Sequence, residues 1–328
     1  MPTLKIYSLA LLSALALTVI SSCKDDDPSV DYNSDKTALQ AFTDSVQLVY
    51  NNSVTGRETG QYPAEAKEEL KEAMDLAGSV ISGAFTQEEV NNAEASLRRA
   101  LFLFKEQIFT EISPESLIAY WKFNGNAADS SGNAHNGSLM GSSASPIPAA
   151  DRFGTAGQAY RFTEGAYIEI PYTASLNPTA FTISSWIYPE ESFANNYIIS
   201  LNRWNGFKVQ LQDANYIFST ISTSTGIYDR ASDPLAVNLN KWTHIAVSYQ
   251  SGALRFYING DLVKTENISG QVLKLESPVN LVIGQELPSS SAEFTAANSF
   301  HGSIDDTRLY GTALSNSEIL SLYNREKP

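Results

Sequence analysis

The chain has 328 residues, of which 43% are apolar, so it is long enough to form two domains with buried cores. Its 36 Asp and Glu residues outnumber its 22 Lys and Arg residues, which gives a formal net charge of −14. So acidic a chain is repelled by the phosphates of nucleic acids and by anionic membrane surfaces. We therefore expect no nucleic-acid partner.

The first 22 residues have the pattern of a bacterial signal peptide. Lys5 precedes an almost uninterrupted apolar run, residues 6–20, which is too short for a stable membrane span. The run ends in Ile20-Ser21-Ser22-Cys23, which resembles the lipobox recognised by the bacterial lipoprotein signal peptidase. The resemblance implies lipid attachment at Cys23, and an ordinary signal peptide followed by a chance cysteine is the alternative. Cys23 is the only cysteine, so a disulfide within the chain is impossible.

An acidic run, Lys24-Asp25-Asp26-Asp27, follows the predicted lipid site. Residues 23–33 are polar and acidic, which predicts a flexible tether. The run resembles the surface-export signal of Bacteroidetes lipoproteins. This resemblance implies an outer-membrane protein, displayed at the cell surface, that contacts the membrane only through its lipid anchor. A solvated acidic linker, which runs of like charge usually form, is the alternative.

Residues 34–112 carry apolar side chains at helical spacing. The three apolar stripes begin at Leu39, Leu70 and Val90, and Thr86-Gln87-Glu88-Glu89 is typical of a capping box. We therefore predict three antiparallel helices. The segment resembles the small three-helix modules that separate anchor and lectin-like domain in Bacteroidetes lipoproteins, which implies a spacer or docking unit.

From Ser113-Pro114 onward the apolar period changes to two, so residues 113–328 are predicted to form a second, mainly β domain. Asn259-Gly260 predicts a tight hairpin, because both residues tolerate positive φ angles. Many short strands with regular turns indicate a sandwich or a barrel. The predicted strands cover residues 159–163, 167–170, 181–188, 207–212, 242–249, 254–258 and 280–284, and a terminal helix covers residues 315–323.

Five segments of this second domain resemble the LamG-like concanavalin A family. They are residues 119–123 with 129–133, 160–162 with 167–171, 181–187, 242–247 with 257–260, and 300–310 with 313–319. The resemblance covers roughly residues 117–323. It implies a concanavalin A-like jelly-roll β-sandwich, preceded by the small N-terminal three-helix bundle.

Glycoside hydrolysis, which the glucanases of this superfamily catalyse, needs two carboxyl groups at a defined separation. The glucanase motif Glu-x-Asp-x-x-Glu is absent from the sequence, and adjacent Asp305 and Asp306 would point to opposite faces of a strand. The three histidines, His135, His244 and His301, are far apart and lack metal-ligand spacing. We therefore predict no catalytic residues and no enzyme activity.

The loop from Asp129 to Gly137 offers the oxygen ligands that calcium prefers. LamG-like domains often bind a structural calcium through this loop and an aspartate pair near the C-terminal strand. The resemblance implies structural calcium, with these candidate ligands: Asp129, Asn133, Asn136, Asp305 and Asp306. An Asx-rich turn, held by its own side-chain hydrogen bonds, is the alternative.

Carbohydrate binding requires exposed aromatic faces that stack on sugar rings, beside amides and acids. Trp204 lies in the polar turn Leu201–Gly206, so we predict a sugar platform there, with packing at a strand edge as the alternative. The other tryptophans fall in strand motifs and are predicted to be core: Trp121, Trp186 and Trp242. The predicted carbohydrate-binding residues are Trp204, Arg203, Asn205 and Tyr228.

Together these features favour a non-catalytic cell-surface lipoprotein that captures a polysaccharide or host glycan for uptake. An adhesion or scaffold module with a protein partner is one alternative, because LamG-like folds serve both roles. A glucanase-like glycoside hydrolase is the other. The step from fold to sugar is an analogy, because one fold carries many functions.

Overall fold

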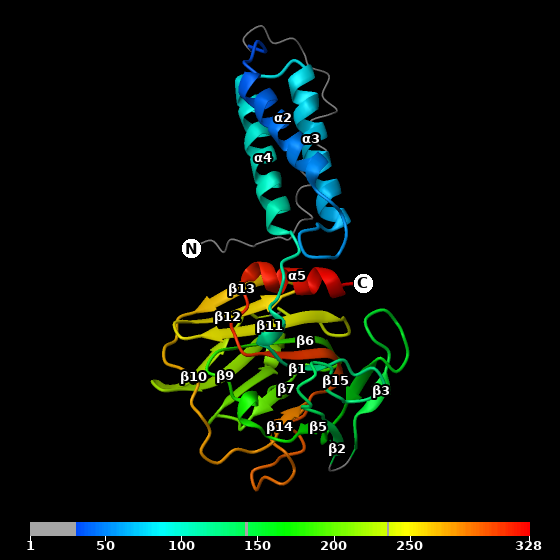
Figure 1. The fold of residues 1–328 in the computed structure, drawn as a ribbon, viewed down its shortest axis with the longest axis vertical. Helices are drawn as coiled ribbons and strands as arrows, with labels where there is room; N and C mark the ends of the chain where they lie inside the picture. Colours follow the sequence, from blue (N-terminus) through cyan, green and yellow to red (C-terminus); the bar gives the residue numbers. More distant parts are fainter. Residues whose placement is uncertain (1–30, 142–143, 235) are drawn as a thin grey trace. The chain divides into compact units, whose positions relative to one another are not determined.

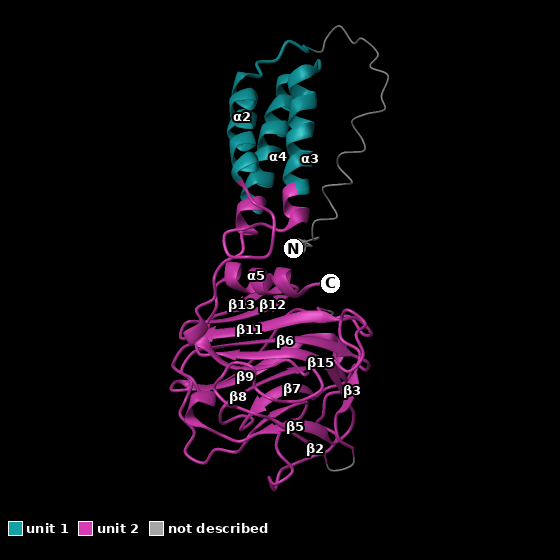
Figure 2. Ribbon diagram, turned by 45° about the vertical axis from the view of Figure 1, so that its right-hand side comes forward, with its two compact units in different colours: residues 1–52, 68–103 teal, residues 53–67, 104–328 magenta. Residues whose placement is uncertain are grey.

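The computed structural model describes residues 31–141, 144–234 and 236–328. Cys23, the acidic run and the predicted signal peptide therefore lie outside the described residues. The chain divides into two compact units, residues 1–52 with 68–103 and residues 53–67 with 104–328, which Figure 2 colours separately. Within the described ranges, no helix is both long and apolar enough to span a membrane.

Three helices form where the apolar stripes predicted them (Figure 1): α2 (Thr37–Asn52), α3 (Ala64–Ser82) and α4 (Gln87–Glu106). Their stripes supply buried residues such as Leu39 and Leu97, which are at most 1% exposed. The predicted capping box starts α4, because Thr86 Oγ1 accepts a hydrogen bond from Glu89 N while the Glu89 carboxylate accepts one from Thr86 N.

The second unit is a sandwich of two antiparallel sheets, as predicted (Figure 1). In the eight-stranded sheet, β1 (Leu117–Trp121) pairs with β15, and the other strands follow the order β13 (Asp261–Glu266), β12 (Ala253–Ile258), β11 (Thr243–Gln250), β6 (Phe181–Pro189), β15 (Gly302–Tyr310), β4 (Ala159–Phe162), β3 (Ile147–Ala149). The seven-stranded sheet has the order β10 (Gly226–Ala231), β9 (Ile217–Thr223), β8 (Phe207–Leu211), β7 (Asn196–Leu201), β14 (Leu281–Ile283), β5 (Ala166–Ile170), β2 (Ser138–Gly141). Three 3-10 turns connect elements at η3 (Pro114–Ser116), η4 (Ala174–Leu176) and η5 (Asp213–Asn215).

The main core lies between the two sheets and takes alternate residues from each strand. Phe181 of β6 and Phe207 of β8 meet across it, with ring centroids 4.8 Å apart. The predicted hairpin joins β12 to β13, and both Asn259 (φ 51°) and Gly260 (φ 84°) have the positive φ angles of a type I′ turn.

A terminal helix, α5 (Asn316–Glu326), covers the outer face of the eight-stranded sheet. It begins as predicted, with Ser315 and Glu318 forming a capping box, and it ends three residues later than predicted. Ile319 and Leu322 pack with Ala246 of β11 and Tyr257 of β12 in a second, smaller core.

One expectation about this unit was wrong, and several strands form outside the predicted ranges. Trp242 lies just before β11, is only half-buried and packs beside Tyr188 with centroids 5.7 Å apart, whereas Trp121 and Trp186 are buried as predicted. The predicted strand ranges omit β1, β2, β3, β7, β9, β10 and β15. In β9 the Ser and Thr residues, and in β10 the mixed pattern, obscure the period of two.

Candidate functional site

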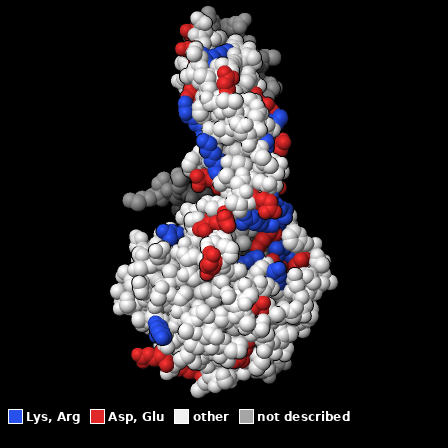
Figure 3. Space-filling view, in the orientation of Figure 1, with Lys and Arg blue, Asp and Glu red and all other residues white. Residues whose placement is uncertain are grey.

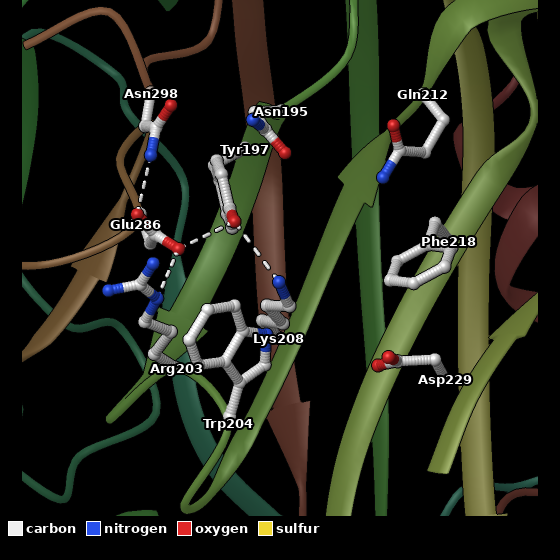
Figure 4. Close-up of a pocket in the computed structure, with 10 residues that line it drawn as sticks. All are labelled: Asn195, Tyr197, Arg203, Trp204, Lys208, Gln212, Phe218, Asp229, Glu286 and Asn298. Atoms are coloured by element: carbon white, nitrogen blue, oxygen red, sulfur yellow. Dashed lines mark hydrogen bonds and ion pairs between the residues drawn. The ribbon is translucent and has the colours of Figure 1, made fainter. Parts of the chain in front are cut away.

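A pocket of about 220 Å³ opens on the outer face of the seven-stranded sheet, the face turned away from the other sheet (Figure 4). Strand alternation explains its polar floor. On β8, Phe207, Val209 and Leu211 enter the core, so Lys208 and Gln210 point outward. Lys208 pairs with Thr220 of β9, and Thr220 pairs with Asp229 of β10, which brings side chains from three neighbouring strands to the same face.

The turn between β7 and β8 places Trp204 at the rim of this pocket. Asn202 (φ 54°) and Arg203 (φ 53°) both have left-handed backbone conformations, which reverse the chain tightly. The Arg203 guanidinium lies 3.9 Å from the centroid of the Trp204 ring and covers one of its faces. The indole remains 46% exposed, so its other surface can receive a ligand.

Lys208 is a buried cation at the floor of the pocket, with an exposed fraction of 4%. Its ammonium donates a hydrogen bond of 3.0 Å to the Tyr197 hydroxyl, and it lies 5.0 to 5.8 Å from the ring centroids of Tyr197, Trp204 and Phe218. Burial lowers the pKa of Lys208. The negative charges of nearby Glu286 and Asp229 act in the opposite direction and raise this pKa. Among the described residues no carboxylate lies within 4.0 Å of this ammonium, and the Tyr197 hydroxyl is the one acceptor that it meets, so two of its three N–H groups have no protein partner.

Glu286 holds one wall of the pocket together. Its carboxylate lies 2.6 Å from Arg203 Nε and accepts hydrogen bonds from the Tyr197 hydroxyl (2.7 Å) and from Asn298 Nδ2 (2.6 Å), as Figure 4 shows. Only 2% of Glu286 is exposed. Burial, together with hydrogen bonding to Glu286, raises the pKa of the Tyr197 hydroxyl. Both carboxylate oxygens of Glu286 therefore already have partners within the protein.

The opposite wall carries Asp229, which is exposed and accepts a hydrogen bond of 2.6 Å from Thr220 Oγ1. Asn195 and Gln212 add amide groups to the lining. Beside them, the buried Gln210 side chain donates to Asn195, and its carbonyl oxygen has no hydrogen-bond partner among the described residues. The pocket thus combines aromatic surface with separate donors and acceptors.

The structure brings two of the predicted carbohydrate-binding residues, Trp204 and Arg203, to this pocket. Asn205 is exposed outside the lining, and its backbone N–H closes the turn by donating to Asn202 O. Tyr228 lies on the opposite face of β10, opposite Ile221, and packs against the core. Its neighbour Asp229 takes the outward position, because successive strand residues point to opposite faces.

Sequence reasoning missed Lys208 and Glu286. The alternation Phe-Lys-Val-Gln-Leu on β8 marks Lys208 as outward-facing, but only the strand order shows that other polar side chains surround it. Glu286 follows β14 by three residues, where the sequence gives no particular signal.

Two carboxylates line this pocket, which raises the question of hydrolysis. A glycosidase needs both members of its carboxyl pair free to act on the substrate. The Glu286 carboxylate is already bonded to Arg203, Tyr197 and Asn298. Asp229 therefore has no second free carboxylate beside it among the described residues of the lining. Of the two lining carboxylates, Asp229 is the one outside an ion pair.

The predicted calcium loop is held by its own hydrogen bonds. The Asp129 carboxylate accepts from the backbone N–H groups of Tyr120, Ser131 and His135 and from the Ser131 hydroxyl. Burial alone would raise the pKa of Asp129, but these bonds together lower it. Asn136 accepts from Asp129 N, so the acceptors needed for a cation are already engaged.

Asn133, the remaining predicted ligand of this loop, donates to the backbone oxygens of Leu117 and Ile118. The loop as placed fits the Asx-turn alternative better than a cation site. In the part of the chain that the structure describes, no cluster of three or more His, Cys, Asp or Glu side chains is arranged to hold a metal ion. Calcium binding stays a prediction.

Asp305 and Asp306 do not point to opposite faces, which corrects the expectation from strand alternation. Asp306 has a φ of 45°, and β15 contains an irregularity between Asp305 and Arg308 in its pairing with β6. Both carboxylates consequently reach Arg152, at 2.6 Å from Asp305 and 2.8 Å from Asp306. They form a buried ion-pair cluster beneath α5, away from the Trp204 pocket.

His244 and His301 also have local partners. His244 is fully buried, bonds to Ser184 and has a pKa lowered to about 3 by burial. His301 bonds to Glu191.

Residues 162–320 match the family model described as the concanavalin A-like lectin/glucanases superfamily. The sandwich is a concanavalin A-like domain. Part of the chain is 44% identical over 78 residues to a gellan lyase of Bacillus sp, and another match is 24% identical over 156 residues to the adhesion G-protein coupled receptor V1 of Danio rerio. These stretches cover 24% and 44% of this chain, but only 3% and 2% of those much longer proteins.

Among solved structures, the concanavalin A-like domain resembles domain 4 of an extracellular arabinanase from Geobacillus stearothermophilus, solved with arabinotriose. The identity is 22% and the TM-score 0.49, and the match covers 63% of this chain and 98% of that one. It also resembles a botulinum neurotoxin serotype D binding domain solved with N-acetylneuraminic acid, at 18% identity and a TM-score of 0.47, over 65% of this chain and 52% of that one.

Proposed function

We propose that the concanavalin A-like domain binds carbohydrate in the pocket beside Trp204. The observation that carries the proposal is the meeting, in one pocket, of a half-exposed indole with the buried Lys208 ammonium and the Asp229 carboxylate. An indole face packs against the C–H surface of a sugar ring, while the charged and amide groups bond its hydroxyls. The match of residues 162–320 to the concanavalin A-like lectin/glucanases superfamily supports this proposal.

The domain is a binding module and not an enzyme. The matched superfamily includes lectins and glucanases, and the one buried carboxylate of the pocket, Glu286, is engaged within the protein, which favours the lectin type. Binding needs only that the lining groups be held in place. The ion pair of Arg203 with Glu286 and the bond from Lys208 to Tyr197 provide this rigidity.

We further propose that the protein is a lipoprotein displayed on the outer membrane, where it captures a polysaccharide or host glycan for uptake. The support is the sequence Ile20-Ser21-Ser22-Cys23 and the acidic run after it. Basic and acidic side chains lie close together on the face seen in Figure 3, and the described residues form no broad basic patch there. That surface suits a ligand held by a pocket, not by long-range attraction to an anionic polymer.

A glycan array tests the binding proposal with the full chain and with Trp204→Ala. We expect the full chain to bind a defined set of glycans and the variant to lose at least ten-fold in affinity, while its thermal unfolding is unchanged. Phe102→Ala is the matched control, because Phe102 is an aromatic residue 62% exposed on α4. Absence of binding to any glycan, or equal binding by Trp204→Ala, would contradict the proposal.

Metabolic labelling with a palmitate analogue tests the anchor. The wild-type chain should incorporate the lipid and be degraded by protease added to intact cells, and Cys23→Ser should incorporate none. Labelling of Cys23→Ser, or protection of the labelled wild-type chain from protease, would argue against a surface lipoprotein.

A further inference from the structure

We propose that the pocket takes a single uncharged sugar unit, whose hydroxyls accept from Lys208 at one end and donate to Asp229 at the other. This inference rests on the proposed carbohydrate binding and adds the class of sugar and the two residues that select it. Four observations carry it: charge balance, the pairing of donor with acceptor, the strand register, and the size of the pocket.

The pocket is charge-balanced before any ligand enters. Two cations, Arg203 and Lys208, and two carboxylates, Asp229 and Glu286, line it. Arg203 and Glu286 are paired at 2.6 Å, so Lys208 and Asp229 balance each other across the remaining space. An acidic sugar would add an uncompensated negative charge near Asp229, and an amino sugar would add a positive one near Lys208. Both are unfavourable in a partly desolvated pocket.

Lys208 and Asp229 have opposite hydrogen-bonding capacities. An ammonium only donates, and an ionised carboxylate only accepts. A sugar hydroxyl does both, so a ring that carries hydroxyls on two edges can satisfy both residues at once. The amide groups of Asn195 and Gln212 add further donors and acceptors to the lining.

The strand register fixes the separation of Lys208 and Asp229. Lys208 on β8 and Asp229 on β10 lie on either side of Thr220 on β9, so their Cα atoms are two strand spacings apart, about 10 Å. Lys208 leans toward Tyr197, away from Asp229 (Figure 4), and the Thr220 hydroxyl is already committed to Asp229. A molecule that touches both ends must therefore bridge β9.

The volume of the pocket bears on the size of a ligand that can bridge β9. The pocket has a volume of about 220 Å³ and is open to solvent on one side. That space accommodates one sugar ring. A longer glycan would place one unit in the pocket and the rest of its chain outside.

Pairs of glycans that differ only in charge provide the test. The full chain is titrated with neutral hexosides and the corresponding hexuronic acids, and with N-acetylated and free amino sugars, at low ionic strength. We expect the neutral member of the recognised pair to bind at least ten-fold more tightly. Asp229→Asn should weaken the neutral sugar and reduce or reverse its advantage over the uronic acid, because the pocket then carries one excess positive charge. Lys208→Met should weaken the neutral sugar as well.

Asp213→Asn is the matched control, since Asp213 is an exposed aspartate outside the lining and its substitution changes the net charge equally. Tight binding of uronic acids or amino sugars that Trp204→Ala abolishes would overturn this inference and leave the proposed function intact. Unchanged selectivity in Asp229→Asn would overturn it too; Asp229 is exposed, and thermal unfolding of the variant checks that it folds. Absence of binding to any glycan would remove the proposed function and this inference together.

Discussion

The Trp186 indole nitrogen donates a hydrogen bond of 2.9 Å to the carboxylate of Glu326, joining the middle of β6 to the last residue of α5. The same carboxylate pairs with Arg308 of β15, whose side chain is 9% exposed. The backbone oxygen of Glu326 accepts a hydrogen bond of 2.7 Å from Arg152 Nε. Glu326 thus fastens the end of the terminal helix to the outer face of the eight-stranded sheet.

Replacing Glu326 should therefore destabilise the sandwich. Glu326→Ala leaves the Arg308 guanidinium buried with Asp306 at 3.9 Å as its remaining acidic partner, so we expect a loss of about 3–5 kcal/mol in the free energy of unfolding. Urea denaturation measures this change. Glu276→Ala, at an exposed acid, should change stability by less than about 0.5 kcal/mol. A loss below 1 kcal/mol for Glu326→Ala would mean that the helix end is not fastened as described.

The cluster beneath α5 should make stability fall with rising pH. Three carboxylates, Asp305, Asp306 and Glu326, share two guanidinium groups, Arg152 and Arg308, so one negative charge is uncompensated when all ionise. Burial, and then the charge of Asp306, raise the pKa of Asp305 to about 8 from 3.8. The folded state therefore holds a proton that the unfolded chain has lost, and stability declines progressively between about pH 4 and pH 8.

Thermal unfolding between pH 5 and pH 9 measures this decline. Asp305→Asn should flatten the pH dependence over that window, because the amide cannot ionise, and Asp213→Asn should leave it as in the wild type. The same slope in Asp305→Asn and wild type would show that another group holds the proton.

Gly206 should be needed for the position of Trp204. A Cβ atom at residue 206 would lie 2.3 Å from the backbone oxygen of Leu201, so Gly206→Ala must displace the turn that carries Arg203 and Trp204. We expect glycan binding to fall at least ten-fold and stability to fall by about 1–3 kcal/mol. Gly78→Ala is the control: its Cβ meets open space within α3, and it should leave binding unchanged and stabilise by about 0.5–1 kcal/mol. Undiminished glycan binding by Gly206→Ala would show that the conformation of this turn does not determine the site.

Asp129→Asn distinguishes the calcium prediction from the Asx turn. Because its carboxylate accepts three backbone N–H bonds, we expect the substitution to lower stability by about 1–3 kcal/mol in the presence or absence of calcium. Chelation by EDTA should leave the melting temperature of the wild type unchanged. A melting temperature that falls on chelation and returns with calcium would instead establish a structural ion.

The sequence alone determined those features that depend on neighbouring residues. The change of apolar period near residue 113 separated helices from strands, Asn259-Gly260 located a hairpin, and Ser315 with Glu318 located the start of α5. Each follows from a local rule, a period, a positive φ or a cap, that needs no knowledge of the rest of the chain. Trp204 was predicted at the site for the same reason, because a tryptophan in a short polar turn has little apolar surface around it.

Only the tertiary structure decided which residues meet Trp204. Glu286 is 82 residues away in the chain and Asp229 is 25 residues away, and they reach the pocket because β14 pairs with β7 and β9 separates β8 from β10. Strand order depends on packing between distant segments, which local patterns do not encode. Likewise, the left-handed backbone at Asp306 reversed an expectation based on regular alternation. The sequence therefore specified the scaffold and one aromatic residue, whereas long-range packing assembled the polar groups around it.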